Sequence, residues 1–324
     1  MRKLLLVVTA LLAIAPSVRA ETADKPTLAF VTNSRTSFWR PAEAGLRKAQ
    51  SELPNYRLLF QPLDEPSPAA QTRLLDELVA AGVVGIVFSP VDTKSMGATI
   101  DRLSRQATIF TMDSDIIDSK RAAYFGSSNV DAGRQAGSLL RKALPAGAKC
   151  MGFVGLLQAT NTQNRVLGMR EALKGSTVEL VDVLGDDFDK ARARRNVLDT
   201  LSSRPEITCM VGFYDYNTPV ILEALAETGR QGQIKVVAFD EETATLKGIK
   251  DGTVLGTVVQ QAYEWGYLSM LSMARFLEGR KSFLPPNGRI ILPTRVIDKD
   301  NVDPYWTELK AMLCCLPAAR EMKR

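Results

Sequence analysis

The sequence contains no histidine in 324 residues. Histidine is the commonest general base near neutral pH and the commonest metal ligand. Its absence argues against the usual acid–base enzymes and against histidine-based metal centres. A Gly-x-Ser-x-Gly motif and a phosphate-binding loop are also missing, which argues against hydrolases and nucleotide enzymes that depend on them. We therefore expect no metal, no cofactor and no enzymatic activity.

Cysteine is scarce, with four residues at Cys150, Cys209, Cys314 and Cys315. Their spacing matches no zinc or redox pattern. Cys150 and Cys209 each begin an apolar, strand-like run, so we interpret them as small buried hydrophobic residues in preference to a disulfide. The spacing leaves the states of Cys314 and Cys315 open.

Long hydrophobic runs are missing too, since no segment has the roughly 20 consecutive apolar residues that a membrane helix needs. The excess of positive charge is small: Lys and Arg number 41 and Asp and Glu 36, a net charge of +5. Arg2, Lys3 and Arg19 supply three of these positive charges, which leaves +2 on the chain after residue 20. Sequence-independent binding of phosphates needs a substantial basic surface. The composition therefore argues against a nucleic-acid partner.

The first twenty residues have the pattern of a secretory signal peptide. A charged start at Met1-Arg2-Lys3 precedes a mostly apolar stretch over 4–15, and Val18-Arg19-Ala20 fits a small-x-small cleavage site. No cysteine follows the apolar stretch, so a lipid anchor is not indicated. We expect cleavage after Ala20 and a protein free in the periplasm.

Short apolar runs alternate with segments of helical period along the remaining 304 residues, which exceed the typical size of one domain. Ten runs are predicted to be strands, in two sets of five: Thr27–Thr32, Tyr56–Gln61, Val83–Phe88, Thr108–Met112 and Ala122–Gly126, then Lys149–Gly155, Val178–Leu184, Ile207–Phe213, Lys235–Asp240 and Val254–Gln260. Repeated strand–helix units predict parallel sheets covered on both faces. The fold class is therefore α/β, with two doubly wound parallel-sheet lobes.

Ligands of doubly wound sheets bind at the carboxyl ends of the strands. The segments that follow the predicted strands are rich in Asp, Asn, Gln, Ser, Arg and aromatic residues: 33–39, 89–92, 113–115, 127–129, 156–165, 214–217, 240–242 and 260–261. A sugar offers hydroxyls that donate and accept hydrogen bonds, and its site needs carboxylates, amides and a guanidinium. Single polar residues after strands are also common turn formers, but eight such loops at one cleft favour a polyhydroxylated ligand.

Motifs in these loops resemble the ribose-binding type of periplasmic sugar-binding protein, the soluble receptors of ATP-driven sugar importers. In order, they are Phe38-Trp39, Ser89-Pro90-Val91-Asp92, Thr111-Met112-Asp113-Ser114, Gly126-Ser127-Ser128-Asn129, Asn161-Thr162-Gln163-Asn164-Arg165 followed by Gly168, Asp187-Phe188-Asp189, Val237-Ala238-Phe239-Asp240 and Val258-Val259-Gln260. The resemblance extends from about Thr27 to Pro293 and rests on the order and spacing of the motifs together.

The resemblance implies the type I periplasmic binding protein fold, in which a three-strand hinge joins the two lobes. The crossovers would lie near residues 127–131, 260–262 and 290–294. The N-terminal lobe would then comprise residues 21–127 and 261–289, and the C-terminal lobe residues 128–260 and 290–324.

A ligand site between the lobes is also implied by the resemblance. Its residues would be Phe38, Trp39, Ser89, Asp113, Asn161, Arg165, Asn217, Asp240 and Gln260. Phe38 and Trp39 would form an aromatic floor under a sugar ring, although Trp39 could instead pack in the lobe core. Asp113 and Asp240 would accept hydroxyl hydrogens from opposite lobes. Arg165 would donate from the second lobe and Gln260 from the hinge, and we expect Arg165 and Asp240 to have ligand and water as their partners.

Two features of the site stay open at this point. Matching Thr218-Pro219 to a helix start selects Asn217 as a ligand residue, whereas ungapped counting selects Tyr214, so Asn217 and Tyr214 with Asp215 are alternatives. Ser114 follows Asp113 where ribose-binding proteins carry an arginine, and Ser89 stands where asparagine is usual. The loss of charged donors favours a sugar, polyol or related solute other than ribose.

The functional hypothesis is a monomeric periplasmic receptor that closes around a sugar or polyol and delivers it to the permease and ATPase of an ABC importer. A receptor for a membrane histidine kinase or chemoreceptor is an alternative, because both partners read the closed form. A glycoside-processing enzyme is a weaker alternative, since paired acids such as Asp186 and Asp187 on one loop rarely span a glycosidic bond. A sugar-responsive transcription factor would need a helix-turn-helix where this chain has its signal peptide.

Overall fold

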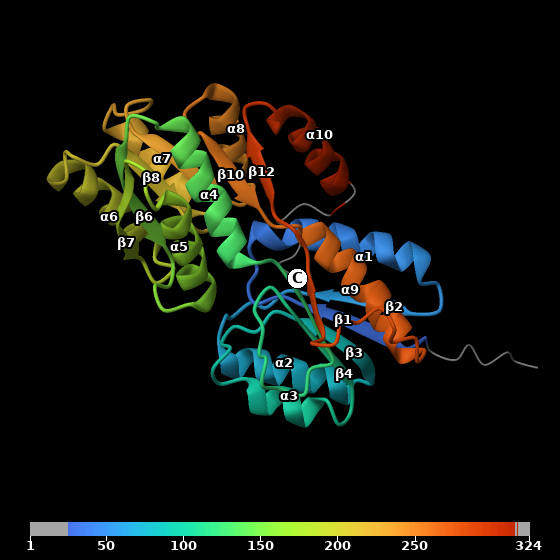
Figure 1. Cartoon of the computed structure of the whole chain (residues 1–324). Coiled ribbons are helices and arrows are strands. Elements are labelled where there is room, and N and C mark those ends of the chain that lie inside the picture. Colours follow the sequence, from blue (N-terminus) through green and yellow to red (C-terminus); the bar gives the residue numbers. More distant parts are fainter. Residues whose placement is uncertain (1–24, 315, 317–324) are drawn as a thin grey trace, which may run out of the picture.

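Residues 25–314 and residue 316 are described by the computed structural model, which has two α/β lobes (Figure 1). The first lobe contains β1 (Thr27–Val31), η1 (Ser37–Trp39), α1 (Arg40–Glu52), β2 (Arg57–Gln61), α2 (Pro68–Ala80), β3 (Val83–Phe88), α3 (Gly97–Leu103), β4 (Thr108–Met112), β5 (Ala123–Gly126), α9 (Ala262–Leu277) and β11 (Arg289–Ile291). The second contains α4 (Asn129–Ala143), β6 (Ala148–Val154), α5 (Thr160–Leu173), β7 (Val178–Gly185), α6 (Lys190–Ser203), β8 (Cys209–Gly212), α7 (Asn217–Glu227), β9 (Lys235–Phe239), α8 (Thr243–Asp251), β10 (Gly256–Val259), β12 (Arg295–Asp298) and α10 (Val302–Leu313).

The two sheets have the same strand order. The first is β2-β1-β3-β4-β5-β11 and the second is β7-β6-β8-β9-β10-β12. All neighbouring strands are parallel except β10 and β12, which are antiparallel. The predicted fold class is confirmed, and each lobe is one copy of the same doubly wound unit. Strands β4 and β9 therefore occupy equivalent positions, which matters for the site.

Each of the ten predicted strands coincides with an observed strand to within two residues at either end. Two further strands, β11 and β12, were not predicted as strands. They are only three and four residues long, and each pairs at the edge of its sheet with a strand more than 35 residues away in sequence. Such long-range pairing leaves little periodic signal in so short a segment.

The chain passes between the lobes three times. It leaves the first sheet between β5 and α4, returns between β10 and α9, and crosses again between β11 and β12. One hydrogen bond joins two of the crossing segments, from Gln261 Nε2 to the Pro293 carbonyl at 2.8 Å, and another joins the third crossing to α4, from Thr294 Oγ1 to Gln135 Oε1 at 2.7 Å. Among the described residues, no helix combines the length and apolar character needed to cross a membrane.

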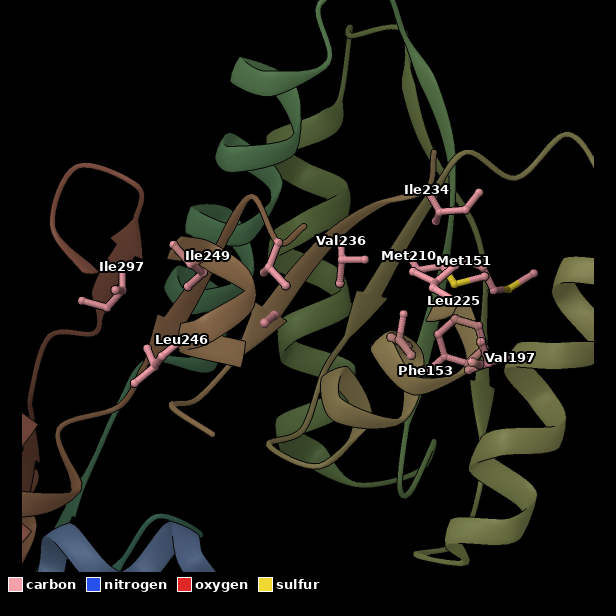
Figure 2. Close-up of a cluster of buried hydrophobic side chains, with 14 of the residues drawn as sticks. Met151, Phe153, Val197, Met210, Leu225, Ile234, Val236, Leu246, Ile249 and Ile297 are labelled. Atoms are coloured by element: carbon pink, nitrogen blue, oxygen red, sulfur yellow. The ribbon is translucent and has the colours of Figure 1, made fainter. Parts of the chain in front are cut away.

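Hydrophobic side chains cover both faces of each sheet. In the first lobe, Leu28 and Phe30 face α1 and α9, whereas Ala29 and Val31 face α2 and α3. In the second lobe, Figure 2 shows Met151, Phe153 and Met210 among the side chains that α6, α7 and α8 cover. The opposite face is packed against α4 and α5 and includes Cys150 and Cys209. These two thiols lie in register on neighbouring strands, fully buried and not disulfide-bonded, as the sequence predicted. Cys314 is exposed, and Cys315 lies outside the described residues.

Glycines allow one helix pair in each lobe to pack backbone against backbone. A Cβ at Gly133 of α4 would lie 2.0 Å from the Arg165 carbonyl oxygen, and one at Gly168 of α5 would lie 1.9 Å from that of Val130. Gly45 of α1 and Gly266 of α9 form the same kind of contact in the first lobe. Real Cβ atoms cannot come so close, so only glycine fits there. In the second lobe this contact fixes the first half of α5, which carries Arg165.

Candidate ligand-binding site

A cleft of about 1000 Å³ lies between the lobes. Its lining comes from both lobes and from the crossing segments: Pro90–Lys94, Asp113–Asp115, Ile117 and Tyr124 from the first lobe, Leu156–Asn161, Asn164, Gly185, Asp187 and Arg192 from the second, and Ser127–Val130, Asn287, Arg289 and Ile291. The volume is at the upper end of the range for small-molecule pockets. Most of these residues follow the carboxyl ends of strands, as expected for doubly wound sheets.

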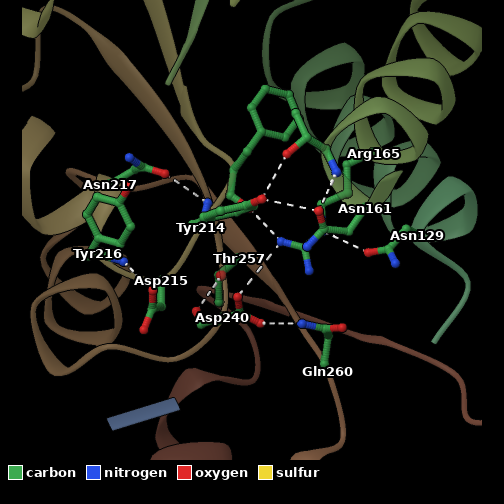
Figure 3. Close-up of polar contacts among 12 residues, drawn as sticks. Asn129, Asn161, Arg165, Tyr214, Asp215, Tyr216, Asn217, Asp240, Thr257 and Gln260 are labelled. Atoms are coloured by element: carbon green, nitrogen blue, oxygen red, sulfur yellow. Dashed lines mark hydrogen bonds and ion pairs between the residues drawn. The ribbon is translucent and has the colours of Figure 1, made fainter. Parts of the chain in front are cut away.

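Arg165 is the centre of a buried polar cluster in the second lobe (Figure 3). Its Nε donates to Asn129 Oδ1 at 2.9 Å, and its Nη1 donates to the Phe213 carbonyl and lies 3.9 Å from Asp240 Oδ2. The guanidinium stacks 4.6 Å from the centre of the Phe239 ring. Arg165 is 2 % exposed. The expectation that only ligand and water would partner Arg165 is therefore wrong, because protein groups hold this guanidinium in place.

Asp240 directly follows β9 in the left-handed backbone conformation, with φ of +63°. Gln260 Nε2 donates to Asp240 Oδ1 at 3.2 Å, and Thr257 Oγ1 donates to the Asp240 carbonyl at 2.7 Å. Asp113 directly follows the equivalent strand β4 and has φ of +58°. Aspartate tolerates this conformation better than most residues, and strain of this kind gathers at functional sites. The two lobes thus present one aspartate each, at matching strand ends.

A chain of hydrogen bonds in the first lobe holds Asp113. Ser89 Oγ donates to Asp113 Oδ2 at 3.0 Å, and Asn33 Nδ2 donates to Ser89 Oγ at 3.1 Å. The Tyr124 hydroxyl donates to the Asp113 carbonyl at 2.9 Å. Asn33 in turn accepts from Trp39 Nε1 at 3.1 Å. The structure therefore brings the side chains of Ser89 and Asp113 together, and Asn33 is a member that the sequence did not single out.

The electrostatics of the site are dominated by carboxyl groups in a poorly solvated space. Burial raises the pKa of Asp113 to about 6, and Asp240 across the cleft adds to the increase while Ser89 and Arg165 oppose it. Burial also raises the pKa of Asp240, which Arg165 and Gln260 partly offset. The pKa of Asp215 rises to about 7 because of burial and of Asp240 and Glu242 nearby. Carboxylates outnumber the single guanidinium among them, so the site favours ligands that donate hydrogen bonds. Within the described residues, no group of three or more cysteines or acids is placed to hold a metal ion.

Comparison with known proteins decides the family. A family sequence model described as "Periplasmic binding protein domain" matches residues 28–281. This chain belongs to the periplasmic binding protein family. The D-ribose/D-allose-binding protein of Pseudomonas aeruginosa is 24% identical over 291 residues, which cover 87% of this chain and 91% of the relative. The ribose import binding protein RbsB of Salmonella typhimurium is 25% identical, over 87% of this chain and 94% of that protein.

Solved structures agree with this assignment. A solute-binding protein of an ABC transporter from Burkholderia graminis, solved in complex with D-arabinose, superposes with a TM-score of 0.80 at 25% identity, over 86% of this chain and 97% of that one. The protein is therefore a periplasmic binding protein of the ribose type, from the sugar-binding receptors of ABC importers. Members of the family bind solutes and are not enzymes, and the family implies a periplasmic location.

The aromatic residues of this periplasmic binding protein differ in position. Trp39 is 3 % exposed and packs against Phe30 and Trp265 with ring centroids 6.2 and 6.4 Å apart. The short helix η1 directs the Trp39 ring inward. In the structure Trp39 is therefore a residue of the lobe core. Phe38 is partly exposed and meets the Trp39 ring edge-on at 4.9 Å. Of the two predicted aromatic residues, Phe38 is the one whose ring is partly exposed.

The loop after β8 contains both alternatives that the sequence left open, Asn217 and Tyr214 with Asp215. Asn217 is 1 % exposed, accepts from the Tyr214 amide at 3.0 Å, and donates to Asp186 Oδ2 at 3.0 Å. Asn217 therefore supports the loop backbone, and Figure 3 shows its bond to Tyr214. The Tyr214 hydroxyl reaches Asn161 Oδ1 at 3.1 Å, and the Tyr214 ring lies 5.9 Å from the Arg165 guanidinium. Tyr214 and Asp215, the alternatives left open by the sequence, are the residues beside the polar cluster.

Asn129 and Asn33 are the clearest residues that sequence reasoning missed. Asn129 belongs to the Gly126-Ser127-Ser128-Asn129 motif, lines the cleft and accepts from Arg165. Its place at the end of a recognised motif was the available signal. Asn33, the second residue after β1, had no such signal beyond its position after a strand.

Proposed function

We propose that this protein is the receptor of an ABC importer, that it binds a neutral or substituted sugar or polyol between its lobes without turnover, and that it delivers this ligand to the permease. Arg165, Asp113 and Asp240 are the residues on which we base the proposal. Asp240 lies 3.9 Å from the Arg165 guanidinium within the second lobe, and Asp113 occupies the equivalent strand end of the first lobe, where Arg165 lowers its pKa. Neighbouring hydroxyls of a sugar can donate to both carboxylates and accept from an arginine at once.

The relatives support a monosaccharide-sized ligand. Two of them are named for ribose, or for ribose and allose, and a structural neighbour was solved with D-arabinose. Ser114 and Ser89 differ from the ribose pattern, so we propose a ligand whose hydroxyl arrangement differs from that of ribose.

A thermal-shift screen of aldoses, ketoses and polyols, followed by calorimetry, tests the proposal. A ligand at a hundredfold excess over its Kd stabilises the folded state by about 2.7 kcal/mol. Asp113→Asn and Asp240→Asn should each weaken binding at least about tenfold, because each loses a hydrogen bond to a charged group. Asp199→Asn, at an exposed position on α6, is the matched control. Failure of every compound to bind, or product formation from one that does, would contradict the proposal.

We further propose that ligand closes the lobes by bending at the three crossing segments. The ligand contacts divide between the lobes, so the closed form offers more of them and is favoured by binding. Ser37 of the first lobe already donates to Glu242 of the second, beside the cluster. Small-angle scattering should give a smaller radius of gyration at saturating ligand. An unchanged curve at a saturation verified by calorimetry would refute closure.

We propose that residues 1–20 are a signal peptide removed after Ala20, and that the mature monomer consists of lobes 21–127 with 261–289 and 128–260 with 290–324. Residues 1–24 lie outside the described residues. The intact mass of periplasmic protein checks the cleavage site, and light scattering during gel filtration checks the monomer.

A further inference from the structure

We propose that the first-lobe end of the cleft is a subsite for an anionic substituent, with Arg289 as its centre. The preferred ligand would then be a sugar or polyol that carries a carboxylate or phosphate group. The inference rests on the proposed function, since it names the class of ligand for the same cleft.

The subsite starts from a buried ion pair that is already complete. Arg121 Nε lies 2.5 Å from Asp115 Oδ1, and Arg121 Nη2 lies 2.8 Å from Asp115 Oδ2. Both side chains are buried. Thr111 Oγ1 also donates to Asp115 Oδ1, at 3.0 Å. One bidentate arginine and a hydroxyl therefore satisfy Asp115 and cancel its charge.

Arg289 is a second arginine at the same carboxylate. Its Nε lies 3.4 Å from Asp115 Oδ2 but makes no hydrogen bond, and its side chain is 38 % exposed. Within the described residues, neither terminal nitrogen of Arg289 has a hydrogen-bond acceptor, and Arg289 lines the cleft. Two arginines around one aspartate leave one net positive charge. The terminal nitrogens of Arg289, which lines the cleft, are the donors that remain for a ligand.

Tyr124 fixes the Arg289 guanidinium in place. Arg289 pairs with Tyr124 in the β11–β5 register, and its guanidinium carbon lies 5.3 Å from the centre of the Tyr124 ring. Arg121 lies 5.9 Å from the same ring centre. A guanidinium held against an aromatic ring loses little further freedom when it binds, and its planar fork matches a carboxylate or a phosphate.

The position of Arg289 relative to Asp113 indicates where the anionic substituent would lie on the ligand. The Tyr124 hydroxyl donates to the Asp113 carbonyl, so one tyrosine separates Arg289 from the polyol-binding carboxylate. The other cleft-lining arginine, Arg192, is paired with Asp187 and adds no net charge. A polyol whose hydroxyls reach Asp113 would therefore place a substituent on this side against Arg289, the cleft arginine whose charge is not cancelled by a carboxylate of its own among the described residues.

Calorimetry on matched probes tests the proposal: D-ribose with D-ribonate and D-ribose 5-phosphate, D-glucose with D-gluconate and D-glucuronate, and inorganic phosphate alone. At least one anionic probe should bind about tenfold or more tightly than its neutral parent, and this preference should shrink at high salt. Arg289→Gln should remove the preference. Arg289→Lys should retain part of it, because the charge stays while the fork is lost. Arg194→Gln, which changes an exposed arginine on α6, is the control.

The outcomes separate this inference from the proposed function. Neutral parents that bind as tightly as their anionic partners, or a preference that survives Arg289→Gln, would overturn the subsite and leave the sugar receptor intact. Phosphate binding that depends on Arg289, without binding of any polyol, would support the subsite and overturn the sugar receptor. Binding of no probe, together with no ligand in the thermal-shift screen of aldoses, ketoses and polyols, would overturn both.

Discussion

Replacing Arg165 with methionine tests whether the polar cluster stabilises the fold in addition to binding the ligand. Methionine retains much of the side-chain length but removes the charge. The Phe213 carbonyl and Asn129 then lose their donor, and Asp240 loses its only counter-charge within the described residues. Breaking a buried ion pair from one side costs about 3 to 5 kcal/mol. Asp240 keeps Gln260, and the ion pair is long at 3.9 Å, so we expect about 3 kcal/mol.

The loss should depend on pH in a defined direction. Burial raises the pKa of Asp240, and Arg165 holds it down. Without Arg165 that pKa rises further, so acid neutralises the stranded carboxylate and removes its penalty. The difference in free energy of unfolding between wild type and Arg165→Met should therefore be larger at pH 8 than at pH 5.

Thermal and urea unfolding at both pH values measure this difference. At pH 8 the melting temperature should fall by roughly 6 to 12 °C, while Arg194→Met, at an exposed arginine, should change it little. Adding Asp240→Asn to Arg165→Met should recover part of the loss at pH 8. A wild-type melting temperature in Arg165→Met would show that the cluster is not part of the folding energy. An equal deficit at pH 5 and pH 8 would show that Asp240 is not its source.

Three further predictions follow from the packing and the carboxyl groups. Gly168→Ala should destabilise the protein by more than about 2 kcal/mol because α4 and α5 must separate, whereas Gly97→Ala, whose Cβ would meet only Ile116 at 3.7 Å, should unfold at nearly the wild-type urea midpoint. Trp39→Phe should lower the free energy of unfolding by about 1 to 3 kcal/mol, because it leaves a cavity beside Trp265 and removes the donor to Asn33. An unchanged free energy of unfolding would indicate that Trp39 lies at the cleft surface and not in the core. The folded-state pKa of Asp215 is about 7, above its unfolded value of about 3.9. The protonated carboxyl therefore stabilises the folded state, and this contribution to the free energy of unfolding declines between about pH 4 and pH 7. Asp215→Asn should flatten that decline in urea titrations, and an unaltered pH profile would contradict the assignment.

The sequence predicted the sheet architecture well for a physical reason. Strands of a doubly wound sheet are buried on both faces, so they are short continuous apolar runs such as Val83–Phe88 and Lys235–Phe239, and helices of clear period separate them. Edge strands β11 and β12 lack this property because partners that are distant in sequence specify their pairing. The prediction therefore succeeded where local burial determines the structure.

Sequence reasoning located the loops of the site but not the direction of every side chain. The two polar clusters contain Asp113, Asp240, Arg165, Gln260 and Ser89. For Trp39 and Asn217 the direction depends on backbone turns a few residues long. The η1 turn directs Trp39 to the core, and a bond to the Tyr214 amide draws Asn217 behind the loop. The composition of neither turn indicates whether its side chains point into the core or toward the cleft.

The repeated fold unit itself explains why the cleft depends on a ligand. Because β4 and β9 are equivalent strands of facing lobes, the left-handed residue after each one presents the same group, Asp113 or Asp240, to the same space. Burial raises the pKa of Asp113, and the Asp240 carboxylate of the other lobe adds to the increase. Arg165 lies 3.9 Å from Asp240 and lowers the pKa of Asp113 as well, but it is held by its own lobe. In the closure that we propose, an empty cleft would bring two carboxylates together with too few donors, whereas a polyol would supply the missing hydroxyl hydrogens. On this reasoning the symmetry that builds the fold also disfavours closure until a donor-rich ligand is present.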